Sequence, residues 1–324
     1  MGEFDLIARY FKRPAKRAVL GVGDDCALLQ PAEGMQLAIS TDMLVEGRHF
    51  FPDVDPFTLG HKALAVNLSD LAACGAQPLA FTLALAMPRA DEAWLAAFSR
   101  GMFALADTHD CELVGGDTTQ GPLNICITVF GEVPRGQALL RSGAQVGDDI
   151  YASGTLGEAR LALDALREHA PLPDELLTLA RTRLEQPTPR VALGMALRGI
   201  ATAAIDVSDG LLGDLGHVLE ASGVGASIDT SIAIHLIAAS AQITRAEKLF
   251  SYEKMLGYVL AGGDDYELAF TAPPSARQAV QEAAQQARTP VTRIGQIEVA
   301  PGIRLHDAQG QVLPKRYASF DHFA

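Results

Sequence analysis

Several features that would place this chain in a common class are missing from its sequence. Only 4 of its 324 residues are cysteines, and none forms a C-x-x-C pair or a spacing with histidine that is typical of a zinc site. These residues are Cys26, Cys74, Cys111 and Cys126. We interpret them as reduced, mostly buried, small apolar residues rather than as catalytic thiols.

Long apolar runs are missing as well. The apolar stretch Leu79–Met87 is about half as long as the roughly 18 residues needed to cross a bilayer. The segment Met1–Asp5 has no basic part followed by an apolar core, so it does not resemble a secretory signal. Leu6 stands where an N-myristoylation signal has Ser or Thr. These absences predict a cytoplasmic protein.

Basic residues are in the minority, with 26 Lys and Arg against 39 Asp and Glu, and the formal net charge is −13 at pH 7. This balance argues against a nucleic-acid-binding surface, because phosphate backbones require Lys and Arg. Most of the acids serve solubility. An acidic protein can still bind an anionic ligand where metal ions invert the local charge.

Neither standard phosphate-binding fingerprint is present. The sequence contains no G-x-x-x-x-G-K-[ST] segment, which excludes a Walker-type nucleotide site. Gly21-Val22-Gly23 starts like a dinucleotide-binding fingerprint, but Cys26 stands where the third glycine belongs. A tight turn after a strand is the better explanation of those two glycines.

What the sequence does contain is a recurrent acidic turn. Five times a short apolar run ends in small residues and one or more aspartates. The aspartates in these turns are Asp24, Asp25, Asp42, Asp70, Asp117, Asp206 and Asp209. Taken singly, each could be a turn residue or a helix N-cap, which is the role that we expect for Asp91.

The recurrence of these turns is less easily explained by capping alone. If the turns meet in space, several carboxylates share one site, and cations must neutralise their mutual repulsion. Mg²⁺ prefers such oxygen ligands and usually binds together with substrate phosphates. We therefore expect a metal–polyphosphate site.

Hydrophobic periodicity predicts interleaved strands and helices in two halves. We expect strands at 19–22, 26–30, 36–41, 79–87, 112–115, 123–133, 149–153, 202–207, 225–229, 266–271 and 291–297. We expect helices at 3–12, 58–74, 91–108, 157–168, 174–186, 190–199, 211–222, 244–258 and 275–287. Asn67 and Asp70 are three residues apart on one of these helices and should share a face.

Two domains with mixed sheets follow from this order of elements. The segment 134–149 is rich in glycine and polar residues, and we place the domain boundary within it, giving domains 1–143 and 144–324. The interleaving favours α+β or α/β layers. Four of the acidic turns lie in the first domain and the fifth lies in the second. A shared site is therefore expected in a cleft between them.

In their order along the chain, these segments resemble bacterial thiamine-monophosphate kinases, which belong to the aminoimidazole ribonucleotide synthetase-like superfamily. The matching segments are Gly21–Ala27, Ser40–Asp42, Asn67–Ala72, Gly115–Thr118, Asp206–Leu211 and Gly262–Leu268. The resemblance covers essentially the whole chain. It implies an N-terminal domain that binds ATP and Mg²⁺ and forms a homodimer, and a C-terminal α/β domain that closes the active-site cleft.

The resemblance also implies a reaction in which ATP and thiamine monophosphate give ADP and thiamine diphosphate by direct, Mg²⁺-assisted in-line transfer. The implied Mg²⁺ ligands are Asp25, Ser40, Thr41, Asp42, Asp70, Asp117, Asp206 and Asp209. The implied ATP contacts are Gly116, Asp117, Arg141 and Ser208. The implied contacts to thiamine monophosphate are His49, Asp264 and Phe320. Arg141 and the metal-bound Asp25, Asp42, Asp70, Asp117 and Asp206 would carry catalysis.

Elementary chemistry agrees with this reaction. The acceptor is a phosphate whose second pKa is about 6, so it is already an anion at pH 7 and needs no general base. The reaction instead needs neutralisation of two anionic phosphates and their in-line alignment, which metal ions and a guanidinium supply. Asp264 and Phe320 are reasonable neighbours for the permanently cationic thiazolium ring.

Simpler roles and other functions remain open at this stage. His49 could be a polar loop residue, Arg141 could pair with a surface acid, and Phe320 could pack on its domain. Asp264 stands where the family often has Glu, and His109 stands near a Tyr that relatives place beside adenine, so the adenine contact is unassigned. The alternatives are another ATP-using enzyme, similar to aminoimidazole ribonucleotide synthetase, and a catalytically silent Mg²⁺–nucleotide sensor.

Overall fold

The computed structural model describes residues 2–168, 172–237, 250–314 and 317. The chain divides into two compact units, which we call unit 1 (Met1–Leu71 with Ala76–Gly136) and unit 2 (Ala72–Gly75 with Gln137–Ala324). The main division, between Gly136 and Gln137, lies a few residues before the boundary expected at 143/144. Within the described ranges, no helix is long and apolar enough to cross a membrane.

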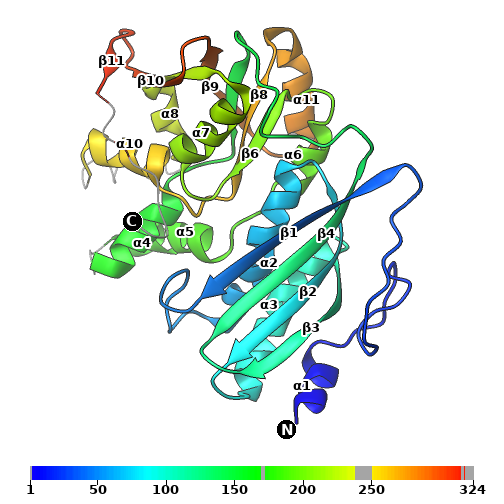
Figure 1. Cartoon of the computed structure of the whole chain (residues 1–324). Helices are drawn as coiled ribbons and strands as arrows, with labels where there is room; N and C mark the ends of the chain where they lie inside the picture. The colour runs from blue at the N-terminus through cyan, green and yellow to red at the C-terminus, as the bar shows by residue number, and fades with distance from the viewer. Residues whose placement is uncertain (1, 169–171, 238–249, 315–316, 318–324) are drawn as a thin grey trace. The chain divides into compact units, whose positions relative to one another are not determined.

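Unit 1 is built on a four-stranded mixed sheet with the strand order β1-β4-β2-β3 (Figure 1). The strands are β1 (Met35–Val45), β2 (Gln77–Met87), β3 (Glu112–Gln120) and β4 (Asn124–Pro134). β4 pairs antiparallel with β1 and with β2, whereas β3 pairs parallel with β2. β1 and β3 are therefore the two edges of the sheet.

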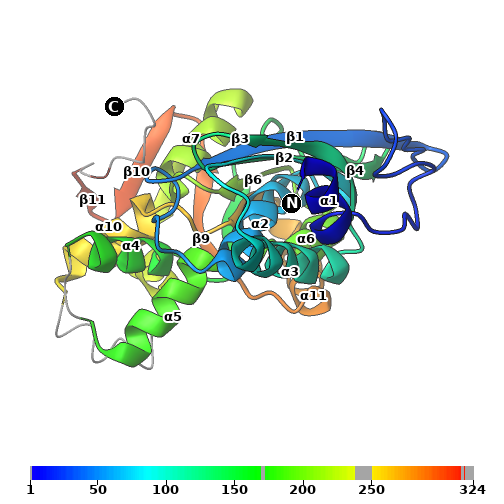
Figure 2. The same cartoon turned by 90° about the horizontal axis from the view of Figure 1, so that it is seen from below.

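Two long helices, α2 (Pro56–Ala73) and α3 (Glu92–Thr108), cover one face of this sheet, as Figure 2 shows. The carboxylate of Asp91 caps α3, as expected, by accepting the backbone N–H groups of Ala93 and Trp94. The two helices approach closely at Gly101, where an added Cβ would lie 1.8 Å from the Phe57 carbonyl oxygen. Glycine at this position therefore determines how closely the helix layer packs.

The other face of the sheet leaves apolar side chains uncovered in this single chain. Side chains alternate between the two faces of a strand. On β1, Leu37, Ile39 and Met43 are 43%, 59% and 52% exposed, whereas Leu44 is buried. The sheet therefore has one face packed on helices and one apolar face directed away from them.

The segment before β1 is a loop rather than the expected pair of strands. Only isolated backbone bridges occur there, including one between Leu20 and Leu28. Gly23 has a φ of +127°, which interrupts any regular strand. Helix α1 (Glu3–Tyr10) precedes the loop and contacts α3 and β3. The start of the loop is held by Glu112, whose carboxylate accepts the N–H groups of residues 16, 17 and 18 at 2.8, 2.8 and 3.1 Å.

Unit 2 is built on a seven-stranded mixed sheet with the strand order β11-β10-β7-β9-β5-β8-β6. Its strands are β5 (Asp149–Ser153), β6 (Ala203–Val207), β7 (Gly225–Asp229), β8 (Glu267–Ala272), β9 (Val291–Glu298), β10 (Gly302–His306) and β11 (Val312–Leu313). Its α-helices are α4 (Glu158–Glu168), α5 (Asp174–Glu185), α6 (Val191–Ala196), α7 (Leu211–Ser222), α8 (Thr230–Ala233), α10 (Tyr252–Ala261) and α11 (Arg277–Gln286). β5, β6 and β8 are buried along their whole length, so both faces of the sheet are covered there.

Most expected elements are present to within a few residues, and the expected mixed sheets are confirmed. The sequence pattern missed β10 and β11, which are short. The helix expected at 244–258 begins at Tyr252, after the N-cap Ser251, and residues 244–249 lie outside the described residues. All four cysteines are free, but only Cys111 is buried, so the expectation that most of them are buried is wrong.

Candidate functional site

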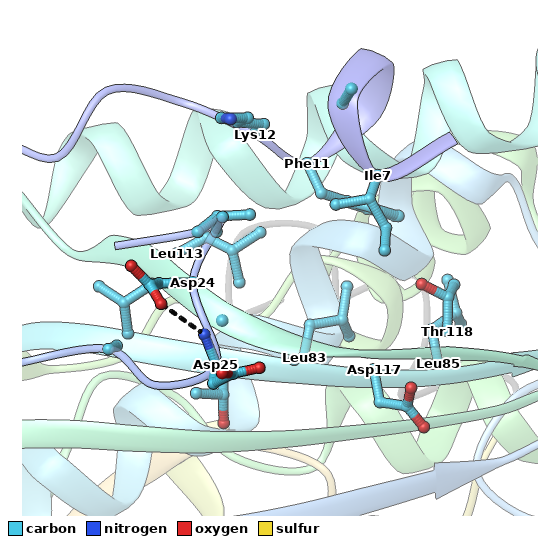
Figure 3. A pocket seen from close by; sticks show the side chains of 18 residues that line it. Ile7, Phe11, Lys12, Asp24, Asp25, Leu83, Leu85, Leu113, Asp117 and Thr118 are labelled. Carbon is cyan, nitrogen blue, oxygen red and sulfur yellow. Dashed lines mark hydrogen bonds between the residues drawn. The ribbon is translucent and has the colours of Figure 1, made fainter. Parts of the chain in front are cut away.

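A pocket of about 790 Å³ in unit 1 is lined by three residues that the sequence predicts for the site, Asp25, Gly116 and Asp117. Its apolar lining includes Ile7 of α1, Phe11 just after α1, and Leu83 and Leu85 of β2, and also Val22, Leu113 and Val114. Figure 3 shows Ile7 of α1 and Phe11, the residue after α1, pointing toward the two leucines, while the carboxylate of Asp117 points to the other side of the strands. The pocket therefore has an apolar side and an acidic side.

Gly116 allows β3 to form part of this pocket. Its φ is +152°, and an added Cβ would lie 1.9 Å from the carbonyl oxygen of Leu83. Only glycine fits here, because any side chain would collide with the neighbouring strand. Lys12 also lines the pocket, and its Nζ lies 3.2 Å from the position that a Cβ on Gly23 would take.

Two of the aspartates that the sequence places in turns, Asp42 and Asp117, lie inside strands instead, whereas Asp70 lies in the helix expected at 58–74. The strand β1 continues through Asp42 because all eleven of its residues pair with β4. The local pattern of small residues predicts a turn, but pairing with a distant strand overrides that preference.

A second group of predicted residues lies between β1 and α2. The Ser40 hydroxyl donates to the Asp70 carboxylate, and the Asp42 backbone N–H donates to the Asn67 side-chain oxygen at 3.1 Å. The Asn67 amide in turn donates to the Ala63 carbonyl oxygen at 3.0 Å, which fixes the orientation of the amide. Asn67 and Asp70 therefore share one face of α2, as predicted.

Thr41 differs from its neighbours on β1. Because side chains alternate along a strand, Thr41 points to the face opposite Ser40 and Asp42. Its hydroxyl forms a hydrogen bond of 2.8 Å with the hydroxyl of Thr128 on β4. Of the three consecutive candidates for metal binding, the structure therefore brings only Ser40 and Asp42 toward Asp70.

The two acidic groups of unit 1 lie at opposite edges of its sheet. Asp42 is on β1 and Asp117 is on β3, so three strand spacings, or about 14 Å, separate their backbones. The registers align Asp42 with Ile127, Leu83 and Gly116 across the sheet, which places Asp117 on the opposite face. Among the residues that the structure describes, no three His, Cys, Asp or Glu side chains are close enough to hold one metal ion.

The chemistry of each acidic group nevertheless fits Mg²⁺. Carboxylate and hydroxyl oxygens are its usual protein ligands, and Mg²⁺ commonly binds to one or two carboxylates and completes its shell with water and phosphate. Asp25 and Asp117 both line the pocket, and Asp42, Asp70 and Ser40 lie together between β1 and α2. The residues therefore fit separate ions better than a single shared ion within unit 1.

In unit 2, the predicted residues Asp206, Ser208 and Asp209 follow one another at the end of β6. Asp206 is buried in the strand, and the turn after it leads into α7. One carboxylate oxygen of Asp214 accepts the N–H groups of Ser208, Asp209 and Gly210 at 3.0, 3.1 and 3.1 Å. Burial and the nearby charge of Asp209 raise the pKa of Asp214 to about 7, against the opposing effect of these hydrogen bonds.

The predicted substrate contact Asp264 lies beside the same turn. Its N–H donates to the Ser208 carbonyl oxygen at 2.7 Å, and the N–H of Tyr266 donates to the Val207 carbonyl oxygen at 2.8 Å. Asp264 and Tyr266 have φ values of +60° and +51°, a conformation that is rare outside glycine and clusters at functional sites. The structure therefore brings together Ser208, Asp209 and Asp264.

A buried ionic cluster, which sequence patterns did not predict, anchors the segment that carries Asp264. Glu267 is fully buried and accepts hydrogen bonds from Arg183 and Arg190 at 2.7 and 2.6 Å. Asp265 is also buried and accepts the N–H of Gly157 at 2.9 Å. Burial and the neighbouring Glu158 raise the pKa of Asp265 well above its usual range. Arg183, Arg190 and Gly157 thus tie the segment to the helices around it.

Of the remaining predicted residues, His49 lies in the turn after β1, where its Nδ1 accepts the N–H of Val45, the last residue of β1, at 3.0 Å. This acceptor role leaves Nε2 as the protonated nitrogen in a neutral ring. Arg141 is exposed in unit 2. Phe320 lies outside the described residues. His109, the C-cap residue of α3, has a pKa lowered by burial and by the nearby His61.

Comparison with known proteins adds independent information. The model of the family described as AIR synthase related protein, N-terminal domain, matches residues 23–133, and the model of its C-terminal domain matches residues 138–308. The thiamine-monophosphate kinase of Salmonella typhimurium is 46% identical over 329 residues, covering 100% of this chain and 98% of the relative. The thiamine-monophosphate kinase of Haemophilus influenzae is 42% identical over 300 residues, covering 92% and 89%.

Solved structures agree in fold. The thiamine-monophosphate kinase of Stenotrophomonas maltophilia K279a has a TM-score of 0.83 and 45% identity, covering 96% of each chain. AaThiL, solved in complex with AMPPCP and TMP, has a TM-score of 0.77 and 28% identity, covering 91% of this chain and 89% of that chain. Both family domains are matched, and full-length relatives exceed 40% identity. The chain therefore belongs to the thiamine-monophosphate kinase family and carries both domains of the AIR synthase related proteins.

Proposed function

We propose that this chain transfers the γ-phosphoryl group of ATP to thiamine monophosphate, giving ADP and thiamine diphosphate, with Mg²⁺ ions at its carboxylates. The observation that carries the proposal furthest is the pocket that joins Asp25, Gly116 and Asp117 to an apolar side. The names of the full-length relatives and the ligands bound by AaThiL support the same reaction.

The pocket suits a nucleotide in a definite orientation. A purine base is flat and largely apolar, so it packs between the side chains of Ile7 and Phe11 and the leucines of β2. The phosphates then extend toward Asp25 and Asp117, where Mg²⁺ offsets the repulsion between carboxylates and phosphates. Gly116 leaves the backbone open to close approach, and Lys12 adds a cation at the rim.

The remaining carboxylates serve the transfer itself. The acceptor phosphate is already anionic, so the protein must align two anions rather than remove a proton. Bound Mg²⁺ supplies positive charge that stabilises the charge on the transferred group. Asp42, Asp70 and Ser40 would hold one ion, and Asp206 and Asp209 would hold another.

Other predicted residues complete the assignment. Ser208 and Arg141 contact the ATP phosphates, and His49, Asp264 and Phe320 contact thiamine monophosphate. Asp264 offers a carboxylate to the cationic thiazolium ring, and the adjacent ring of Tyr266, whose hydroxyl is 3.4 Å from Asp264 Oδ1, adds an aromatic surface. Thr41 is the weakest of the proposed metal ligands, because its hydroxyl is bound to Thr128.

We further propose that the chain functions as a homodimer. Leu37, Ile39 and Met43 form an exposed apolar row on one edge strand, and a second copy of this chain is the occupant that would cover it. Within one sheet, the backbones of Asp42 and Asp117 are about 14 Å apart. In such an assembly the second copy would bring its own carboxylates to the site.

The purified protein tests the reaction directly. Incubated with ATP, thiamine monophosphate and Mg²⁺, it should form thiamine diphosphate and ADP in equal amounts, and excess EDTA should stop both. Turnover of formylglycinamidine ribonucleotide in place of thiamine monophosphate would favour the synthetase of the same superfamily. Nucleotide binding without any turnover would instead favour the sensor.

A further inference from the structure

The turn after β6 is organised around a single carboxylate oxygen. Asp214 lies in the first turn of α7 and is 4% exposed. Its Oδ2 accepts hydrogen bonds from three consecutive backbone N–H groups, those of residues 208, 209 and 210. A carboxylate oxygen has two lone pairs, so three donors on one oxygen make an unusually dense set of contacts.

Asp214 is the acceptor that the structure gives for all three of these donors. Gly210 has a φ of +117°, and an added Cβ would lie 2.9 Å from the backbone of Ala261, so only glycine fits at this position. The three N–H groups belong to the residues directly before Leu211, the first residue of α7. Without an acceptor, buried donors are costly, and the turn must rearrange.

The same turn is held on its other side by the segment that carries Asp264. The Ser208 and Val207 carbonyl oxygens accept the N–H groups of Asp264 and Tyr266 at 2.7 and 2.8 Å. The N–H groups of Ser208 and Asp209 thus bind Asp214, while the Ser208 carbonyl binds Asp264. A shift of this turn would therefore move residues assigned to ATP, to metal and to substrate together.

We propose that Asp214 is a positioning residue for phosphoryl transfer, which fixes Ser208 and Asp209 for the Mg²⁺–nucleotide through its contacts with their backbone. It does this without touching the nucleotide itself. The identity of the ligand rests on the function proposed above, whereas the role of Asp214 in fixing the conformation of the turn does not. The competing explanation is that Asp214 only stabilises the start of α7.

Two substitutions and a matched control separate these explanations. Asp214→Asn keeps an oxygen acceptor at the same place, whereas Asp214→Leu removes it at similar volume. Asp229 is the control, because its carboxylate accepts the N–H groups of Ser231 and Ile232 at the start of α8, which follows β7 in the same unit. Asp229→Leu therefore removes a carboxylate that also accepts consecutive backbone N–H groups.

The experiment measures kcat and KM for ATP, binding of Mg²⁺–AMPPCP by calorimetry, and amide hydrogen exchange at residues 207–210. We expect Asp214→Leu to lower kcat/KM for ATP by about 100-fold, the scale of a small misplacement of catalytic groups. It should also weaken AMPPCP binding and speed exchange in the turn. Asp214→Asn should stay within about tenfold of the wild type, and Asp229→Leu should match the wild type in both activity and binding.

Three results would overturn the proposal. Asp214→Leu could retain AMPPCP binding and kcat/KM, or Asp229→Leu could lose as much activity as Asp214→Leu, which would make the role purely structural. Asp214→Asn could be as inactive as Asp214→Leu, which would show that the charge matters and not the acceptor. If Asp214→Leu does not fold, the kinetics of Asp214→Asn and the amide hydrogen exchange at residues 207–210 in that variant decide the question. A wild type that binds AMPPCP but forms no thiamine diphosphate would remove the proposed reaction and leave the test of the turn valid.

Discussion

At the scale of single residues, aspartates of similar sequence context have different roles. Asp42 and Asp117 are candidate ligands on two separate strands, whereas Asp214 and Asp149 are buried and bonded to the protein itself. The sequence pattern found the candidates because small residues and an acid follow an apolar run. It could not find Asp214, since the three N–H groups that Asp214 accepts become convergent only after the turn has folded.

Asp42→Asn should lower kcat by at least about 100-fold and leave the thermal unfolding temperature within about 2 °C of the wild type. The substitution removes a negative charge needed for metal binding, while the hydrogen bond from the backbone N–H of residue 42 to the Asn67 side chain is retained. Steady-state kinetics and calorimetry would check this, with Asp53→Asn, an exposed loop acid, as the control. An unfolded Asp42→Asn variant would show that this acid is structural.

Asp149 gives a pH-dependent prediction. Hydrogen bonds and ion pairs with Arg277 and Arg293 lower the pKa of this carboxyl. A lowered folded-state pKa means that the ionised carboxylate stabilises the fold above about pH 4, its unfolded value, and that this stabilisation is lost as the pH falls further. This stabilisation is small, because the guanidinium groups of Arg277 and Arg293 are exposed and solvent screens their charges.

Asp149→Asn should therefore unfold about 2–4 °C below the wild type at pH 7. The difference should shrink when the pH is lowered from 5 toward 3. Thermal unfolding followed by circular dichroism at several pH values would measure it. A difference that is the same at pH 3 and pH 7 would contradict the assigned role.

At the scale of elements, the local pattern succeeded where an element is long and periodic and failed where distant pairing decides. The helices α2 and α3 and the strand β2 match their expectations closely. The apolar runs at 19–22 and 26–30 do not form strands, because they pair with each other only at the isolated bridge between Leu20 and Leu28 and join neither sheet. In contrast, β3 continues through Gly115-Gly116-Asp117, since β2 provides a partner for each of these residues.

The crossing of α2 and α3 provides a matched pair of glycine variants. Gly101→Ala places a Cβ 1.8 Å from the Phe57 carbonyl oxygen, so we expect a loss of about 1–3 kcal/mol in the free energy of unfolding. Gly216→Ala, in α7, meets no atom within 4 Å and should be stabilising by about 0.5–1 kcal/mol. Urea denaturation would measure both, and equal effects would show that the contact does not constrain the helices.

At the scale of the whole molecule, the sequence predicted two domains with mixed sheets, and the structure and the family models agree. The candidate site was predictable residue by residue only through resemblance to a family. The placement of Asp42 and Asp117 at opposite edges was not predictable, because it depends on the strand order β1-β4-β2-β3. From sequence order alone, β3 and β4 would be expected to pair with each other, whereas in the structure β2 lies between them.

The proposed homodimer makes a prediction about mass. The wild type should sediment at about twice the 34.3 kDa of one chain, and Ile39→Lys should sediment as a monomer with unchanged circular dichroism. Val299→Lys is the control, since Val299 is 74% exposed in unit 2. A wild type that is monomeric at micromolar concentration, or an Ile39→Lys variant that stays dimeric, would remove this face as the interface.

Direct phosphoryl transfer can be measured by following the phosphorus of the γ-phosphate. With ATP labelled at the γ-phosphate, thiamine monophosphate and Mg²⁺, we expect the label in the terminal phosphate of thiamine diphosphate, with one ADP formed for each labelled product. Label recovered only as inorganic phosphate, or AMP formed in place of ADP, would contradict direct transfer of a single phosphoryl group.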